Sequence, residues 1–293
     1  MSDPLDFPLS AAESTTLVRA ALEEDRAFDD VTTLSVVPSL AMASALMVAR
    51  SAGVIAGLPL AIAAFELLAA DTECRARVHD GAHVAESTPV LELSGSARAL
   101  LSAERVALNF VQRLSGVATL TARYVSAVRG THAKILDTRK TTPGFRALEK
   151  YAVRCGGGTN HRADLAAAVL IKDNHLATLG GDIALAVRRA QSEAPAGIQV
   201  EVECDHRDQV ARAVAAGADV ILLDNMTPAE MRVCVDLVHG AAIVEASGGI
   251  TLATVRAVAE SGVDWISVGA LTHSVPALDL ALDFRHDATL TRR

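Results

Sequence analysis

Apolar and polar residues in the first hundred positions recur with the periods of helices and strands. Leu17, Ala20 and Leu22 share one face of residues 13–25, with acidic residues on the other, which predicts an amphipathic helix. Pro59 suits the first turn of a second helix, which is expected to end at residue 70. Short apolar runs predict strands at residues 41–49, 54–56, 75–79 and 84–93, the last two joined by an Asp80-Gly81 turn. This part of the chain is therefore expected to form an α+β sandwich.

The pattern changes near residue 97, where two helical stretches begin. They cover residues 97–114 and 116–129, with a break or kink expected at Ser115-Gly116. Strands and helices then alternate. The strands are expected at residues 134–137, 168–172, 199–204, 220–224, 242–246 and 265–268. The helices between them are expected at residues 145–155, 182–193, 207–216, 228–239 and 251–261. This alternation predicts a parallel sheet covered by helices.

Similar turns precede two of these strands, and they indicate repeated βα units. Gly217-Ala218-Asp219 and Gly262-Val263-Asp264 both connect a helix to a strand. Six strands are too few for a standard eight-stranded barrel. We expect a first domain over residues 1–115 and an α/β domain over residues 116–275. Residues 276–293, with Leu280, Leu282 and Phe284, are expected to pack back on the first domain.

Composition narrows the class of protein. A hydrophobic content of 51% supports a large buried core and excludes a disordered chain, and a net charge of -8 argues against nucleic acid as the partner. The N-terminus lacks the basic region of a secretory signal. Glycines and Pro59 interrupt the most membrane-like window, residues 52–70, so no membrane span is expected. Four cysteines without C-x-x-C spacing indicate reduced thiols in a cytoplasmic protein and no zinc site.

Cationic residues follow the predicted strands at their carboxyl ends, where function gathers in parallel α/β folds. Arg139 and Lys140 follow the first strand, Lys172 ends the second, and His161 and Arg162 lie between them. Cations concentrated in an acidic protein predict a pocket for a small polyanion. Because an arginine fork binds a carboxylate through two hydrogen bonds, Arg139 and Arg162 suit a dicarboxylate. His161 and Lys172 are expected to complete that cradle.

Acidic residues end the next two strands. Glu203 and Asp224 suit Mg²⁺ bound by one or two carboxylates together with substrate phosphate. They also suit the stabilisation of positive charge that develops as a leaving group departs. Glu201 alternates with Glu203 along one strand and therefore faces the same side. A structural ion pair of Glu201 with Lys140 or Lys172 is the open alternative to a catalytic role.

Two glycine-containing turns follow the last strands. Ser247-Gly248-Gly249 precedes the helix expected from residue 251, and backbone N–H groups with a helix dipole there suit a phosphate. Gly269-Ala270, directly after Val268, suits the other half of such a site. A plain tight turn is the alternative for the Gly-Gly pair.

An ordered set of motifs resembles one known family. The motifs are DTRKTTPG, KYAVRCGGGTNHR, LIKDNH, VEVECD, ILLDN, EASGGIT and ISVGALTHS, between about Leu101 and His273, with weaker likeness at residues 30–33 and 50–53. They are similar to the quinolinate phosphoribosyltransferases, also called nicotinate-nucleotide pyrophosphorylases. The resemblance implies an N-terminal sandwich followed by an incomplete barrel of about seven strands, as in type II phosphoribosyltransferases.

The resemblance also implies a reaction and roles for residues. Quinolinate and 5-phosphoribosyl-1-pyrophosphate would give nicotinate mononucleotide, pyrophosphate and CO₂, a step of NAD biosynthesis that uses Mg²⁺. Lys140, Lys172, Glu203 and Asp224 would be catalytic. A homodimer is implied, because Arg105 would reach the neighbouring subunit's site. The implied substrate-binding residues are Arg105, Thr138, Arg139, Lys140, His161, Arg162, Lys172, Glu203, Asp224, Ser247, Gly248, Gly249, Val268, Gly269 and Ala270.

Two other functions stay open at this point. A Schiff-base lyase on a similar barrel would use Lys140 or Lys172 at a strand end. A non-catalytic paralogue would bind an anion without turnover. Trapping with borohydride and a carbonyl substrate would identify the first, and tight binding without product the second.

Overall fold

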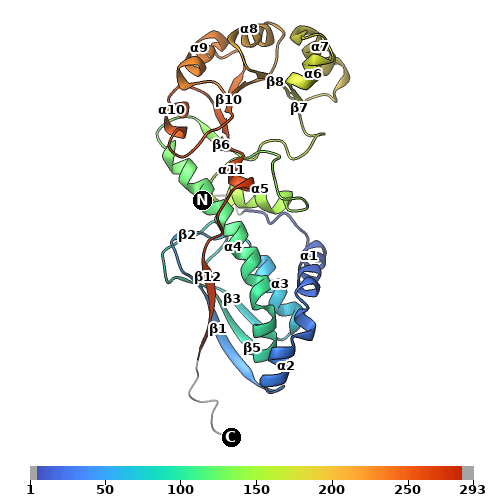
Figure 1. Cartoon of the computed structure of the whole chain (residues 1–293), viewed down its shortest axis with the longest axis vertical. Coiled ribbons are helices and arrows are strands. Elements are labelled where there is room, and N and C mark those ends of the chain that lie inside the picture. Colours follow the sequence, from blue (N-terminus) through green and yellow to red (C-terminus); the bar gives the residue numbers. More distant parts are fainter. Residues whose placement is uncertain (1–4, 286–293) are drawn as a thin grey trace. The chain divides into compact units, whose positions relative to one another are not determined.

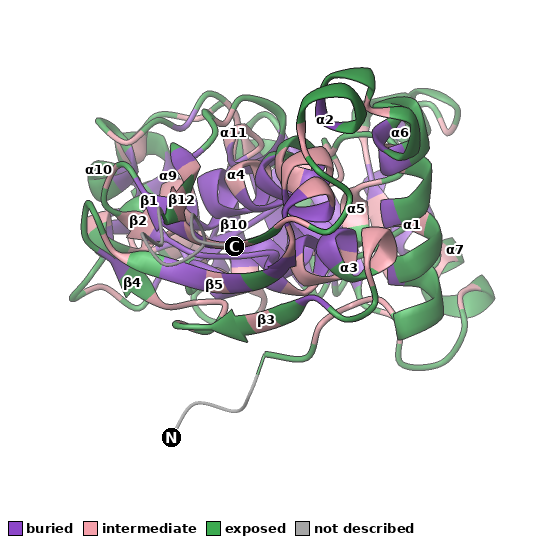
Figure 2. Ribbon diagram, turned by 90° about the horizontal axis from the view of Figure 1, so that it is seen from below, coloured by how far each residue is buried: buried purple, intermediate pink, exposed green. Residues whose placement is uncertain are grey.

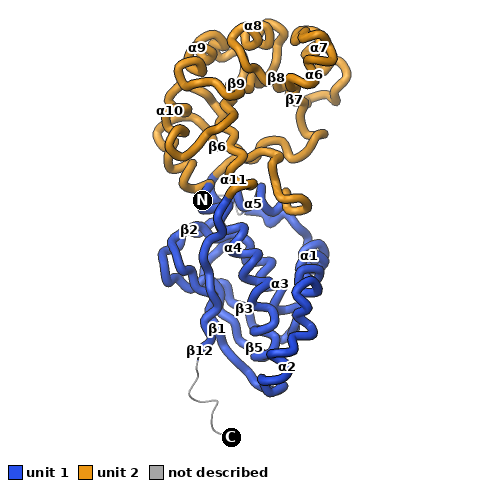
Figure 3. The backbone as a smooth tube through the Cα atoms, viewed as in Figure 1, with its two compact units in different colours: residues 1–120, 147–157, 275–293 blue, residues 121–146, 158–274 orange. Residues whose placement is uncertain are grey.

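The computed structural model describes residues 5–285 of a chain that divides into two compact units (Figure 3). The first unit contains residues 1–120, 147–157 and 275–293, and the second contains residues 121–146 and 158–274. The division at residue 120 lies inside one long helix, as does the position expected for the domain boundary. Residues 147–157 group with the first unit, although the sequence placed them in the second domain.

An antiparallel sheet with strand order β12-β1-β5-β3 forms the first unit's largest sheet. Its strands are β1 (Met42–Ala49), β3 (Glu73–Ala76), β5 (Pro89–Ser96) and β12 (Leu280–Arg285). The tail was expected to pack back on the first domain, and β12 does pair with β1 along its whole length, whereas residues 286–293 of that expectation lie outside the described residues. A single strand over residues 84–93 was wrong: Ser87 has a left-handed backbone (φ 65°) between β4 (His83–Val84) and β5. The short β4 pairs instead with β2 (Gly53–Val54).

Helices supply much of the first unit's core. They are α1 (Ala11–Glu24), the 3₁₀ turn η1 (Ala27–Asp29), α2 (Val31–Val36), α3 (Leu58–Leu68), α4 (Ala97–Ala127) and α5 (Arg146–Cys155). Ser10 and Glu13 form a reciprocal cap that starts α1. Buried residues concentrate on β1, β5 and α3 (Figure 2). Within residues 5–285, no helix combines the length and apolar composition needed to cross a bilayer.

The break expected at Ser115-Gly116 is absent, and α4 is continuous from Ala97 to Ala127. Gly116 has a different purpose, because a Cβ atom there would lie 2.3 Å from the backbone oxygen of Pro276. The glycine therefore allows close packing of the returning chain and does not end the helix.

Six parallel strands form the second unit's sheet, in the order β6-β11-β10-β9-β8-β7 (Figure 1). They are β6 (Lys134–Leu136), β7 (Val169–Ile171), β8 (Val200–Cys204), β9 (Val220–Asp224), β10 (Ile243–Ser247) and β11 (Trp265–Ser267). The six strands predicted from the pattern are confirmed. The resemblance implied about seven, and in the described chain Thr159 makes only an isolated parallel bridge to Leu136 on the free side of β6. The result is an open, barrel-like α/β sheet.

The helices of the second unit connect these strands. They are α6 (Asp173–Ala177), α7 (Ile183–Glu193), α8 (Arg207–Ala215), α9 (Pro228–Val238), α10 (Val255–Ala259) and α11 (Ala270–His273). The repeated turns predicted from Gly217 and Gly262 are confirmed, since both have positive φ. The aspartate that follows each accepts a backbone hydrogen bond from the neighbouring strand, Asp219 from Val200 and Asp264 from Val244. These turns set the strand register that brings the carboxyl ends together.

Candidate active site

A cavity of about 410 Å³ lies within the second unit, at the carboxyl ends of its strands. Residues from five strands and from two loops meet there. The lining residues are Thr138, Arg139, Lys140, His161, Arg162, Leu170, Lys172, Glu203, Leu222, Asp224, Glu245, Ser247 and Ser267. Nine of the fifteen substrate-binding residues predicted from the sequence are among them. Segments up to 129 residues apart in the chain, from Thr138 to Ser267, therefore share one site.

Strand register explains why the acidic residues reach this cavity. Glu203 on β8 pairs with Leu222 on β9, and Leu222 pairs with Glu245 on β10. Paired residues in a sheet point to the same face, so these three side chains form one row. Two residues further on, Asp224 pairs with Ser247 and forms the next row. The inward face of the sheet thus presents carboxylates from three adjacent strands, β8, β9 and β10.

The cationic residues enter from loops. Arg139 and Lys140 follow β6, where the Thr138 hydroxyl accepts a hydrogen bond from the Lys140 backbone over 3.1 Å. The Thr272 hydroxyl donates to the Lys140 carbonyl over 2.7 Å and fixes the loop from the other side. The buried Nε of Arg139 has no hydrogen-bond partner among the described residues. An unpaired buried donor in a cavity is available to a ligand anion.

Arg162 is partly anchored to the protein. One of its guanidinium nitrogens donates to the Ala168 carbonyl over 3.0 Å. Burial lowers the Arg162 pKa, and the nearby positive charge of Arg139 adds to the effect. Two guanidinium groups so close together form a site in which a bound dianion is stabilised.

The opposite flank pairs charges directly. The Lys172 ammonium forms an ion pair with Glu203, although the sequence had placed the two on different substrates. Asp224 accepts a hydrogen bond from the Asn225 side chain. The alternative that Glu201 pairs with Lys140 or Lys172 was wrong, because Glu201 pairs with His161. Glu203 rather than Glu201 thus carries the lysine contact.

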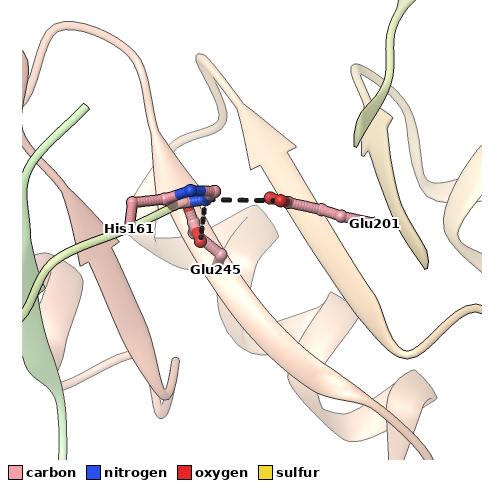
Figure 4. A group of neighbouring side chains, drawn as sticks. All are labelled: His161, Glu201 and Glu245. Carbon is pink, nitrogen blue, oxygen red and sulfur yellow. Dashed lines mark ion pairs between the residues drawn. The ribbon is translucent and has the colours of Figure 1, made fainter. Parts of the chain in front are cut away.

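His161 lies between two buried carboxylates (Figure 4). Its Nε2 is 3.3 Å from an oxygen of Glu201 on β8 and 3.3 Å from an oxygen of Glu245 on β10. Glu201 is 3% exposed and Glu245 0%, so neither carboxylate is solvated. The ligating atoms of the three residues all lie within 4.8 Å of one another, a spacing that a metal ion would also fit. Burial raises the Glu201 pKa and the charge of Glu245 adds to the rise, against the hydrogen bond from His161.

The groups around the two ring nitrogens of His161 favour different protonation states of the ring. Burial disfavours a charged ring, but the hydrogen bonds and charges of Glu201 and Glu245 outweigh burial and raise the His161 pKa to about 10. The backbone N–H of Arg162 acts in the opposite direction, because it donates to Nδ1 over 2.7 Å and requires a lone pair there. Nε2 carries a proton in either form, and it faces the carboxylates.

Six predicted site residues do not line the cavity. Arg105 lies on α4 in the first unit, where it borders a different cavity with Asp25 and Arg26. Gly248 and Gly249 have positive φ, but the helix expected to follow them begins only at Val255, so no helix dipole acts on that turn. The others are Val268, Gly269 and Ala270, and a Cβ atom on Gly269 would lie 3.2 Å from Cδ of Lys140.

Sequence reasoning missed four residues that line the cavity. They are Leu170, Leu222, Glu245 and Ser267. Glu245 carried a signal that was available, because it is an acidic residue inside an apolar run and alternates with Ser247 along a predicted strand. The two leucines carried none, since apolar residues on such a strand are indistinguishable from core.

Comparisons with known proteins agree over nearly the whole chain. Residues 30–115 match the N-terminal domain of quinolinate phosphoribosyl transferase, and residues 117–283 match its C-terminal domain. Nicotinate-nucleotide pyrophosphorylase (carboxylating) of Mycobacterium leprae (strain TN) is 44% identical over 286 residues, 95% of this chain and 99% of the relative. The Homo sapiens protein of that name is 40% identical over 241 residues, 80% of each chain.

Solved structures show the same similarity in three dimensions. The nicotinate-nucleotide pyrophosphorylase from Francisella tularensis superposes with a TM-score of 0.91 at 38% identity, covering 97% of this chain and 100% of that one. The fold class expected from the sequence is confirmed by this match. With both domains matched in order, the chain belongs to the quinolinate phosphoribosyl transferase family.

Proposed function

We propose that this phosphoribosyltransferase moves the phosphoribosyl group of 5-phosphoribosyl-1-pyrophosphate to quinolinate, and that decarboxylation follows. The products are nicotinate mononucleotide, pyrophosphate and CO₂, which serves NAD biosynthesis. One observation carries the proposal: a single cavity joins the cations Arg139, Arg162 and Lys172 to the carboxylates Glu203 and Asp224. A dicarboxylate and a magnesium pyrophosphate need these opposite surroundings next to each other.

The pyridine dicarboxylate would bind to the cationic flank. Arg139 offers a buried Nε without a hydrogen-bond partner in the described chain, and its charge lies close enough to lower the pKa of Arg162. Each planar fork matches one carboxylate. Thr138 and Lys172 border the same flank. His161 supports this flank, since both of its ring nitrogens already face protein groups.

The ribose pyrophosphate would bind to the acidic flank with Mg²⁺. Glu203 and Asp224 fit the ion chemically, because both present carboxylate oxygens to the cavity from adjacent strands. When bound, Mg²⁺ would neutralise the pyrophosphate as it leaves. Lys140 would contact the pyrophosphate, and the turns at Ser247-Gly248-Gly249 and Val268-Gly269-Ala270 would bind the 5′-phosphate through backbone N–H groups.

The reaction needs no covalent bond to the protein. The pyridine nitrogen donates its electron pair to C1 of the ribose, and the bond from C1 to the pyrophosphate oxygen breaks. The carboxylates near C1 stabilise the positive charge that develops there. The ring, now a pyridinium, accepts the electron pair released when the adjacent carboxylate leaves as CO₂, and a proton then replaces it. A Schiff-base mechanism through Lys172 is disfavoured because its amino group is engaged in an ion pair with Glu203.

The direct test mixes the purified protein with quinolinate, 5-phosphoribosyl-1-pyrophosphate and Mg²⁺ and measures nicotinate mononucleotide. Chelation of divalent ions with EDTA is expected to stop product formation, and added Mg²⁺ to restore it. A folded protein that binds quinolinate but forms no product would indicate the non-catalytic paralogue instead. Persistence of full activity in EDTA would remove Mg²⁺ from the proposal.

The protein would work as a homodimer in which Arg105 completes the neighbouring subunit's site. Val31 and Leu34 are exposed apolar residues that border the cavity containing Arg105, and Val36 and Leu40 are exposed nearby in the chain. Exposed apolar residues of this kind mark association surfaces. Four free cysteines support a reducing compartment, for which we propose the cytoplasm.

Complementation tests the role of Arg105. Arg105→Ala and Arg139→Ala are each expected to be inactive. Co-expressed, they should regain roughly a quarter of wild-type activity, because a hybrid dimer has one intact site. Hybrid dimers that stay inactive would show that Arg105 acts within its own subunit or not at all.

A further inference from the structure

The segment that carries Arg162 has no regular secondary structure, yet Arg162 must present its guanidinium accurately. Residues 160–162 belong to no helix or strand. Thr159 is held by its bridge to Leu136, with a 2.8 Å hydrogen bond from its N–H to the Ile135 carbonyl. Beyond Thr159 the backbone leaves the sheet. Other groups must therefore fix the direction in which Arg162 points.

Buried carboxylates provide these anchors. Asp137, which is 0% exposed, accepts the His161 backbone N–H over 2.9 Å and the Asn160 side chain over 2.6 Å. The His161 ring then accepts the Arg162 backbone N–H at Nδ1. The opposite edge of the ring faces Glu201 and Glu245 (Figure 4). The ring thus links the backbone of Arg162 to β8 and β10.

This arrangement lowers the stability of the fold more than a purely structural contact would. One Nε2–H serves two carboxylates: within the described chain Oε1 of Glu245 has no hydrogen-bond partner, and Oε2 has only the 3.3 Å ion-pair contact with Nε2. Burying a carboxylate with so little compensation destabilises a fold. An apolar residue at position 245 would fill the space at lower cost. A residue that lowers the stability of the fold is a candidate for a role in function.

A metal ion is the other explanation for this cluster, and the ring orientation argues against it. An ion bound at Nε2 would leave the ring proton on Nδ1. The Arg162 N–H already points at Nδ1 over 2.7 Å, so two hydrogens would meet there. The donors and acceptors around the ring therefore match a proton on Nε2.

We infer that Glu201 and Glu245 are positioning residues, which hold the His161 ring and thereby aim Arg162 at a carboxylate of the substrate. The inference rests on the proposed function for the identity of that substrate, quinolinate. Neither glutamate needs to touch the substrate for this role. A binding group contributes fully only when it is correctly oriented, since a displacement of about 1 Å can lower the rate about a hundredfold.

The test compares Glu245→Leu with Glu245→Gln. Glu245→Leu removes one of the two buried carboxylates that share a single Nε2–H, so its melting temperature should equal or exceed that of the wild type, while the Kd for quinolinate measured by calorimetry rises at least about tenfold. Affinity for 5-phosphoribosyl-1-pyrophosphate should stay unchanged. Glu245→Gln keeps a carbonyl oxygen for Nε2–H and should bind quinolinate nearly as the wild type does.

A double-mutant cycle separates positioning from packing. In an Arg162→Ala background, Glu245→Leu should have no further effect on the quinolinate Kd, because the group that it positions is gone. Additive effects, equal loss of affinity for both substrates, or a Glu245→Leu protein that melts early or does not fold would overturn the inference.

These measurements can refute the proposed function and the positioning role of Glu245 independently. A wild-type protein that binds quinolinate without forming product refutes the proposed function alone, and the binding comparison still decides the inference. An active wild type whose Glu245→Leu variant binds quinolinate normally refutes the inference alone. A wild-type protein that does not bind quinolinate refutes both.

Discussion

The two units of this molecule differ in how fully the carboxylates within them are hydrogen-bonded. Asp80 in the first unit accepts hydrogen bonds from the backbone N–H groups of Gly57 and Leu58 and from the Tyr151 hydroxyl. Glu245 in the second unit has one oxygen without a hydrogen-bond partner among the described residues, and its other oxygen has only the 3.3 Å contact with Nε2 of His161. One carboxylate caps the start of a helix, and the other lies against His161 in the candidate active site.

The contrast extends beyond these two residues. In the described chain, buried side-chain atoms without a hydrogen-bond partner occur at one residue of the first unit, Thr72. In the second unit they occur at Arg139, Glu201, Glu245 and Ser267, all at the cavity or against His161, which lines it. Unsatisfied polar groups cost stability, so their concentration at one place marks where function overrides it. If this contrast is correct, substitutions at the cavity should change activity, and substitutions at Asp80 should change stability.

The largest effect is expected at Arg139. Arg139→Leu removes a guanidinium that has no protein partner at Nε, so kcat/KM for quinolinate should fall by about a hundredfold or more, with the melting temperature unchanged. Arg139→Lys should recover little, because an ammonium lacks the bidentate fork. Arg256→Leu, which breaks an exposed ion pair with Glu260, is the matched control and should stay active. Loss of stability in Arg139→Leu would end the contrast between the units.

The reverse pattern is expected at Asp80. Asp80→Ala leaves two backbone N–H groups and the Tyr151 hydroxyl without their acceptor, and the free energy of unfolding should fall by about 1–3 kcal/mol. The specific activity of the folded fraction should be unchanged. Urea unfolding followed by circular dichroism measures the first quantity and the product assay the second. A lower kcat at full stability would contradict the structural role.

Titration of Asp80 gives a smaller, pH-dependent effect. Burial raises the Asp80 pKa above its ordinary value of 3.8, against the hydrogen bonds from Gly57 and Tyr151. The folded state therefore keeps the proton longer than the unfolded state, and this contribution to stability is complete below pH 3.8 and lost as pH rises through the raised pKa. Asp80→Asn cannot titrate. Its stability relative to the wild type should therefore increase as pH rises over that window, and a constant difference would contradict the raised pKa.

The smallest effect is expected from Tyr151→Phe. This change removes one 2.9 Å hydrogen bond to Asp80 and keeps the ring, which packs edge-on against Phe7. The free energy of unfolding should fall by about 1 kcal/mol. Phe7→Leu, which keeps the hydroxyl, tests whether ring packing contributes separately. A loss for Tyr151→Phe as large as that for Asp80→Ala would show that the backbone hydrogen bonds add nothing.

Several features of the fold followed from local pattern, and the exceptions have local causes. The strand at residues 220–224 was predictable because buried parallel strands are continuous apolar runs, and the strand at residues 199–204 because apolar and acidic residues alternate along it. The left-handed Ser87 could not be recognised, since serine rarely adopts that conformation. Gly116 resembled a helix break because the chain that packs against it is 160 residues away, at Pro276.

For the site too, some features were predictable from the sequence and others were not. Arg139, Lys172, Glu203 and Asp224 were recognisable because each ends a strand, and the carboxyl ends of parallel strands meet at one edge whatever the details of packing. Sequence pattern therefore determined which residues gather. Only the folded chain decided which of them touch. The pairing of His161 with Glu201 and Glu245 depends on strands separated by β9 and on a loop without regular structure. No spacing along the chain encodes such contacts, because they arise from strand order and register.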